Sequence, residues 1–149
     1  MLKNKRLVIL IVFLLLSGLI GYSLINRNPP MPTVKTEGND RVPVRQASFC
    51  WKGFFSAMCV DMAEPFMVEG REGVPVQPGE TISITFNQTP LNKMETVSTW
   101  KEGDNLPKET PMDSANHFEA PREEGTYGIS LNTEWNRGSV SHYFFIDVR

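Results

Sequence analysis

Two cysteines are the residues of this chain whose type and spacing point most directly to chemistry. Cys50 and Cys59 are the only cysteines in the sequence, and in an oxidising compartment they would pair. Such a bridge would staple one local hairpin or loop, whereas an immunoglobulin bridge joins cysteines much farther apart in the sequence. Paired free thiols are the alternative, and two cysteines cannot by themselves enclose a structural zinc ion.

Large apolar side chains crowd the segment between the cysteines. Trp51, Phe54, Phe55 and Met58 lie within it, and Asp61 follows just beyond it. Aromatic and methionine side chains are common at protein interfaces, so these residues are our candidate partner-binding patch, with Asp61 at its rim. The alternative is that the apolar members cap one end of a hydrophobic core and that Asp61 is simply solvated.

Two common motifs of catalytic and metal sites do not occur in the sequence. The two histidines stand in no His-Glu-x-x-His pattern, and no Gly-x-Ser-x-Gly is present. His142 falls on the apolar side of a predicted strand, which favours a buried structural role. His117 stands in an acidic stretch without a recognisable partner, and that stretch holds no Asp-x-Asp-x-Asp-Gly calcium loop. We therefore expect no catalytic residue, no metal site and no cofactor.

The N-terminal segment predicts export. Three basic residues precede an uncharged apolar run over residues 7–25, which as a helix could cross a hydrocarbon layer of about 30 Å. Basic residues before the run place the N-terminus in the cytoplasm and the rest of the chain outside the cell. We expect a transmembrane anchor over residues 1–25 and a single-pass location in the cell membrane. The alternative is cleavage after Gly21 and Ser23, which would release a secreted protein.

Charge is divided unevenly along the rest of the chain. The formal net charge is −2, but residues 1–45 are basic on balance and residues 46–149 are acidic. An acidic domain repels phosphates, so we expect no nucleic-acid partner. Residues 26–45 hold four prolines and few large apolar side chains, which is the pattern of an extended extracytoplasmic linker.

From residue 46 onward, apolar residues alternate with a period of two, as in half-buried strands. Thr126–Trp135 and Val140–Val148, joined by a turn that ends at Gly138, predict a β-hairpin. The pattern lapses between Trp100 and Pro121, which is expected to be a loop. Roughly five to seven short strands and no further helix predict an antiparallel sandwich. The other predicted strands are Phe49–Trp51, Ala57–Val60, Glu80–Phe86 and Met94–Trp100.

Several short motifs support the same fold. They are Phe49-Cys50-Trp51, Cys59-Val60-Asp61, Pro78-Gly79-Glu80, Gly125-Thr126-Tyr127, Trp135 with Gly138, and a Phe-rich last strand. In these motifs, residues 46–149 resemble the uncharacterised small exported, membrane-anchored β-sandwich proteins of Bacillus-like bacteria. The resemblance implies an all-β, antiparallel, immunoglobulin-like or fibronectin-III-like sandwich preceded by one N-terminal transmembrane helix. It carries over no catalytic residue, because a shared fold does not confer a function.

Three functions compete at this point. The leading hypothesis is a membrane-tethered, extracytoplasmic β-sandwich that serves as a binding or accessory module for an exported protein or the cell wall. The second is an extracytoplasmic sensor or regulator that binds a small ligand or cation. The third is a wall-active enzyme, which the lack of catalytic motifs disfavours.

Overall fold

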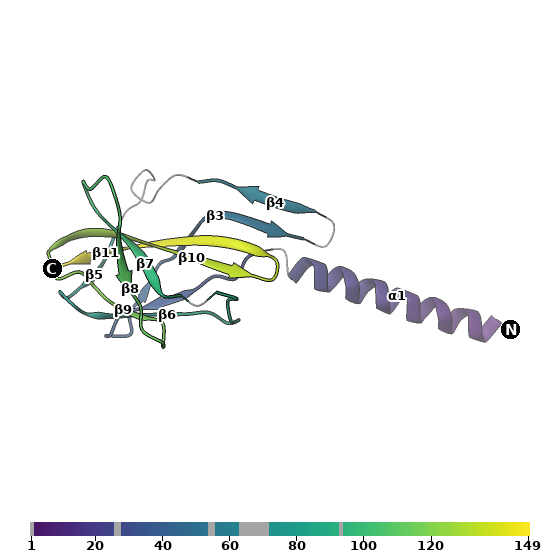
Figure 1. The fold of residues 1–149 in the computed structure, drawn as a ribbon. Coiled ribbons are helices and arrows are strands. Elements are labelled where there is room, and N and C mark those ends of the chain that lie inside the picture. Colours follow the sequence, from purple (N-terminus) through teal and green to yellow (C-terminus); the bar gives the residue numbers. More distant parts are fainter. Residues whose placement is uncertain (1, 26–27, 54–55, 63–71, 93) are drawn as a thin grey trace.

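The computed structural model describes residues 2–25, 28–53, 56–62, 72–92 and 94–149 of the chain, and it consists of one helix followed by strands (Figure 1). In chain order the elements are α1 (Leu2–Ile25), β1 (Thr33–Lys35), β2 (Arg41–Val42), β3 (Arg45–Lys52), β4 (Ala57–Val60), β5 (Val74–Val76), β6 (Thr81–Thr85), β7 (Thr96–Lys101), β8 (Lys108–Pro111), β9 (His117–Glu119), β10 (Gly125–Trp135) and β11 (Gly138–Val148).

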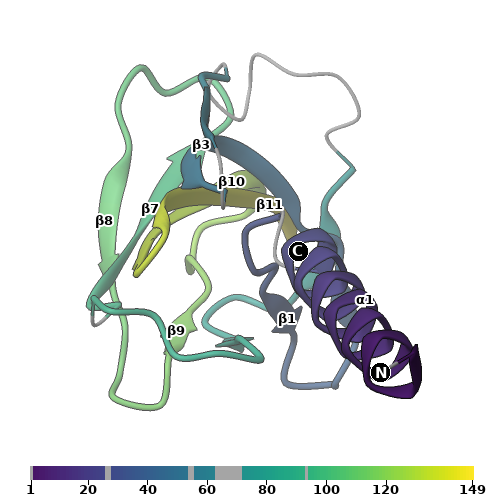
Figure 2. The ribbon, with the colours of Figure 1, turned by 90° about the vertical axis from the view of Figure 1, so that its right-hand side faces the viewer.

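The strands form two sheets with a shared core between them. The smaller sheet has the order β2-β1-β6-β9, and the larger has the order β4-β3-β11-β10-β7-β8, with β5 added to β11 as a parallel strand. Figure 2 shows the two layers on end, with β3, β10 and β11 in one and β1 and β9 in the other. The predicted all-β, sandwich-like fold is confirmed. The immunoglobulin-like or fibronectin-III-like form is wrong, because the larger sheet has seven strands instead of three to five.

The N-terminal helix forms, but the transmembrane helix predicted for this segment is wrong. Within the described ranges, no helix combines the length and the apolar character needed to pass through a membrane. A crossing needs about 20 consecutive, mainly apolar residues, and three of the first five residues of α1 are cationic. The single-pass location in the cell membrane depended on that anchor and is corrected with it.

The hairpin of β10 and β11 organises the core. Its register runs from Gly125 opposite Val148 to Trp135 opposite Gly138, which confirms the predicted hairpin and its turn. Alternate side chains along both strands, such as Ile129 on β10, are buried between the sheets. A slip of one residue would turn these apolar faces toward solvent, so the alternation in the sequence fixes the register.

Two short strands, β1 and β2, lie within residues 26–45, which were predicted as an extended linker. Val34 and Val42 are buried in the main core, and β1 pairs with β6 in the smaller sheet. The two strands are only three and two residues long, too short to show a period. The neighbouring prolines are compatible with them, because proline is tolerated at edge strands and strand ends.

Two further strands occupy the stretch between Trp100 and Pro121 that was predicted as a loop. β8 pairs with β7 at one edge of the larger sheet, and β9 pairs with β6 at one edge of the smaller sheet. The sequence pattern did not predict these two strands because they contain charged residues and proline. These residue types are depleted in strands generally, yet they are common in edge strands. The sandwich therefore has an open side on which two sheet edges lie near each other.

Candidate binding surfaces

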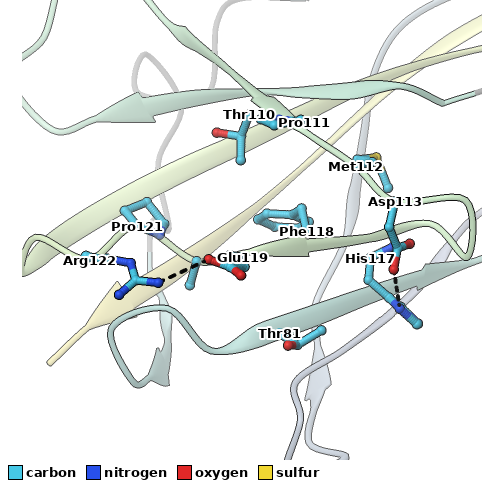
Figure 3. Close-up of a pocket in the computed structure, with 11 residues that line it drawn as sticks. Thr81, Thr110, Pro111, Met112, Asp113, His117, Phe118, Glu119, Pro121 and Arg122 are labelled. Carbon is cyan, nitrogen blue, oxygen red and sulfur yellow. Dashed lines mark hydrogen bonds and ion pairs between the residues drawn. The ribbon is translucent and has the colours of Figure 1, made fainter.

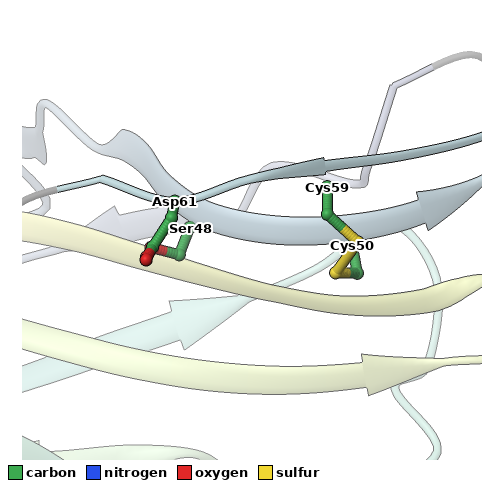
Figure 4. The surroundings of a disulfide bond; sticks show 4 residues. All are labelled: Ser48, Cys50, Cys59 and Asp61. Atoms are coloured by element: carbon green, nitrogen blue, oxygen red, sulfur yellow. A yellow bond between two sulfur atoms is a disulfide. The ribbon is translucent and has the colours of Figure 1, made fainter.

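The cysteine hairpin is formed by β3 and β4 at the other edge of the larger sheet. Cys50 and Cys59 lie directly opposite each other and are joined by a disulfide, with their Cα atoms 4.0 Å apart. Figure 4 shows this bridge and, farther along the same hairpin, Ser48, whose hydroxyl donates a hydrogen bond to the Asp61 carboxylate at 3.0 Å. The predicted disulfide is confirmed, and it staples a local hairpin as expected.

Reducing the disulfide should lower the free energy of unfolding by about 2–3 kcal/mol, the value that the chain-entropy model gives for so short a ring. Both cysteines are exposed, so a reductant can reach the bridge in the folded protein. Urea unfolding with and without a phosphine reductant measures the loss. The double variant Cys50→Ser, Cys59→Ser should have the same urea midpoint as the reduced wild type, and the reductant should not change that midpoint. A midpoint that does not move on reduction would contradict the prediction.

The residues predicted as a partner-binding patch do not all lie at the surface of the structure. Met58 and Asp61 are exposed, whereas Trp51 is buried. Phe54 and Phe55 lie outside the described residues. The three described members therefore belong partly to the core and partly to the surface.

Trp51 belongs to a small core at the hairpin end of the sandwich, where it packs with Trp135 and Val140. The Arg137 guanidinium lies 5.6 Å from the centre of the Trp51 ring. Arg137 is held there because its Nε donates a hydrogen bond to the Lys52 carbonyl at 2.7 Å, while the Lys52 amide donates to the Arg137 carbonyl. Trp51 is thus a structural residue, as the core-capping alternative expected.

A groove opens on the side of the sandwich away from the cysteine hairpin, between β8 and β9. Its main cavity has a volume of about 620 Å³, within the range of roughly 300–1,000 Å³ usual for small-ligand sites. Figure 3 shows apolar side chains between two charged ends, one at Asp113 and His117 and the other at Arg122 and Glu119. The apolar lining includes Pro111, Met112, Phe118, Ala120 and Pro121.

The two edge strands hold the walls of this groove in place. Thr110 of β8 pairs with Val97 of β7, and its hydroxyl shares a hydrogen bond of 2.8 Å with the hydroxyl of Thr99. On the other wall, Phe118 of β9 lies opposite Ile82 of β6, and both side chains are buried. The apolar lining is therefore continuous with the core, which keeps it rigid.

One end of the groove carries a histidine–aspartate pair. Nδ1 of His117 lies 3.1 Å from Oδ2 of Asp113, and Oδ1 of Asp113 accepts hydrogen bonds from the backbone amides of His117 and Ala115. These amide bonds, with the amide of His117 contributing most, hold the pKa of the Asp113 carboxyl below its ordinary value. Asn116, with φ of 61°, closes the turn between the two partners. The pair therefore shapes a fixed turn at this end.

A second hollow of about 570 Å³ continues the groove toward its other end. The two hollows share four lining residues, so they form one elongated depression. The shared residues are Thr110, Glu119, Pro121 and Arg122.

The lining of this second hollow contains both cationic side chains and carboxylates. Lys101 forms an ion pair with Glu123, and Arg122 lies 3.5 Å from Glu119. The hydrogen bond and charge of Lys101, together with the charge of Lys108, lower the pKa of the Glu123 carboxyl. The Lys108 side chain makes no direct ion pair or hydrogen bond with any residue in the described ranges. It stands opposite the buried Thr99 in the register, so its side chain leaves the sheet on the groove side.

Sequence reasoning missed the groove, although it noted His117. The signal that could have revealed it is the segment from Asp113 to Asn116, whose residue types favour a tight turn. A tight turn between Lys108–Pro111 and His117–Glu119 would have suggested two short strands with a shared hollow.

No family model matches the chain, and no curated protein or solved structure matches it either. The resemblance to exported β-sandwich proteins therefore stays a prediction.

Proposed function

We propose that the protein is a binding module that holds a small, mainly apolar ligand with an anionic group in the groove between β8 and β9. The observation that carries the proposal is a ligand-sized cavity with an apolar lining, continued by a second hollow that holds one cation, Lys108, whose side chain no described residue pairs. This proposal follows the second function considered from the sequence, a module that senses a small ligand.

The position of Lys108 supports an anionic group, although Asp104 adds a carboxylate to the lining of the same hollow. Lys101 and Arg122 are already balanced by the carboxylates of Glu123 and Glu119. Lys108 is exposed where it lines the second hollow, and its side chain makes no direct ion pair there, so it can pair with a carboxylate or phosphate of a ligand. The apolar body would lie along Phe118 and toward the His117 end, where removing apolar surface from water provides the main driving force.

Decanoate is a suitable first probe, because it combines a carboxylate with an apolar chain. We expect it to raise the melting temperature, since a ligand bound only by the folded state stabilises that state. The variant Lys108→Gln should bind decanoate roughly tenfold more weakly, a loss of about 1.4 kcal/mol. Its affinity for decanol should not change, because decanol has no charge to pair. Calorimetric titration measures both affinities.

The matched control is Arg41→Gln, which removes a cation from β2 at the opposite edge of the smaller sheet. It should leave decanoate binding intact. The proposal fails if decanoate neither binds nor stabilises the wild type, or if the two variants lose affinity equally.

Binding of another protein remains a separate proposal. The sequence assigned it to the patch around the cysteines, and of that patch Met58 and Asp61 are accessible in the described part of the chain. Because Trp51 is buried, any such contact would use Met58, which lies opposite Trp51 on β4 and is exposed, or Asp61.

A further inference from the structure

The strand at one end of the larger sheet lacks the features that usually protect a sheet edge. As far as the chain is described, the two strand orders end in β2, β9, β4 and β8, and β5, which pairs with β11 alone, is a further edge strand that carries Pro75. Natural edge strands discourage pairing with other chains through charged residues and proline. β4 has neither, since it reads Ala57-Met58-Cys59-Val60. The other three have them: Arg41 in β2, Glu119 in β9, and Lys108, Glu109 and Pro111 in β8.

The hydrogen-bond pattern of the hairpin shows which backbone groups of β4 are free. Gly53 donates to the Ser56 carbonyl, and bonded and non-bonded pairs alternate along an antiparallel ladder from that point. Cys50 and Cys59 are therefore a non-hydrogen-bonded pair, which agrees with the short distance between their Cα atoms. The N–H and C=O groups of Cys59, and by the same alternation those of Ala57, point away from β3 toward the open edge.

The open edge is also exposed and held in position. Ala57, Met58 and Cys59 are exposed, and Met58 keeps 53% of its surface accessible. The disulfide fixes the middle of β4 against β3. Ser48 fixes its end, because its hydroxyl contacts Asp61 and accepts a hydrogen bond from the Met62 amide at 2.9 Å. A strand fixed in this way loses little conformational entropy when it pairs with another strand.

We propose that β4 pairs antiparallel with β4 of a second copy of this chain, about a two-fold axis at Met58. In this register Ala57 of each copy faces Cys59 of the other, so the outward N–H and C=O groups of both residues become paired. Met58 meets Met58 of the second copy on the face that also carries Trp51, because directly opposed residues share a face.

Among the edge strands of a second copy, the uncharged β4 is the partner that suits β4 best. Two β4 strands bring no charged side chain opposite another, whereas two β8 strands would bring together lysine, glutamate and proline. The contact is small compared with the roughly 1,200–2,000 Å² buried in stable interfaces, so the dimer should dissociate on dilution. Added salt should strengthen it, since screening weakens the repulsion between the acidic bodies while the β4 contact itself is uncharged.

Sedimentation equilibrium of the full chain over a range of concentrations tests the pairing. We expect a reversible monomer–dimer equilibrium for the wild type and at least about tenfold weaker dimerisation for Met58→Lys. A second variant, Ala57→Pro, removes an outward N–H without removing a bond to β3, and it should weaken the dimer similarly. Circular dichroism and the disulfide, assayed with a thiol reagent, establish that each variant is folded.

The matched control is Glu109→Lys, which adds a lysine to β8 at the opposite end of the same sheet and should leave dimerisation unchanged. Hydrogen exchange adds a local readout, because the amides of Ala57 and Cys59 should become protected as the concentration rises. The proposal is overturned if the wild type stays monomeric at all concentrations. It is also overturned if Met58→Lys and Ala57→Pro both dimerise as strongly as the wild type. The second result would place the contact elsewhere, for instance on α1.

Discussion

Replacing Gly138 by alanine should destabilise the sandwich by at least about 3 kcal/mol. Gly138 opens β11 opposite Trp51 and has φ of 145°, a conformation that side chains with a Cβ rarely adopt. An added Cβ would lie 1.8 Å from the carbonyl oxygen of Cys50. Because this obstacle is backbone, no side-chain rotation relieves it, and β3 must separate from β11. Urea unfolding followed by tryptophan fluorescence measures the loss.

Gly103→Ala is the matched control for this prediction. Gly103 also has a positive φ, 92°, but an added Cβ would meet nothing within 4 Å. Its replacement should cost only the backbone strain of a residue with a side chain, about 1 kcal/mol. Equal losses at the two glycines would show that close packing against β3 contributes nothing at Gly138.

Acidification from about pH 6.5 to pH 4 should cost the folded state about 3 kcal/mol through His142 alone. The His142 side chain is fully buried, and its ring centre lies 5.9 Å from that of Phe86. Neither ring nitrogen makes a hydrogen bond of normal geometry. Burial lowers the pKa of His142 to about 4, and the nearby backbone carbonyl of Pro30 offsets only part of this effect.

The direction of the effect follows from which state binds the proton first. The unfolded chain, with an ordinary histidine pKa near 6.5, takes up the proton before the folded protein does. The free energy of unfolding therefore falls as the pH drops from about 6.5 toward 4, and the contribution of His142 is constant below that. Above pH 6.5 the imidazole is neutral in both states and the full stability is present.

Urea midpoints between pH 4 and 7 measure this loss in the wild type and in His142→Leu. The variant has no group to protonate at this position, so most of its pH dependence in that window should disappear. Asp113 and Glu123 have lowered carboxyl pKa values, so their stabilising effect is lost mainly as the pH falls below the ordinary carboxyl values, at the acid end of this window. A slope that His142→Leu leaves unchanged would assign the effect to other groups.

The two longest strands could be predicted from their alternation, and the strands that were missed are all short. β10 and β11 each have 11 residues, enough for the alternation to fix both the hairpin and the burial of His142. β1, β2, β8 and β9 have two to four residues, too few to show a period. Their positions are set by partners distant in the sequence, such as β6 for β1.

The site was predictable only where its chemistry is local. The disulfide joins residues close in the sequence, and its two strands were predicted. The role of Trp51 was left open, because the sequence could not show that β3 places it opposite Gly138 and against Trp135. The groove was missed altogether, since its walls come from the edges of two different sheets and exist only after both sheets have assembled.

The central place of β11 has a consequence for how the chain matures. β11 lies between β10 on one side and both β3 and β5 on the other, yet it follows all of them in the sequence. During translation it therefore emerges from the ribosome after its neighbours, and β3 has no partner on that side until then. Until β11 has emerged, the larger sheet of the nascent chain is incomplete and its apolar surface is exposed. We therefore expect this protein to depend most on a chaperone during that interval.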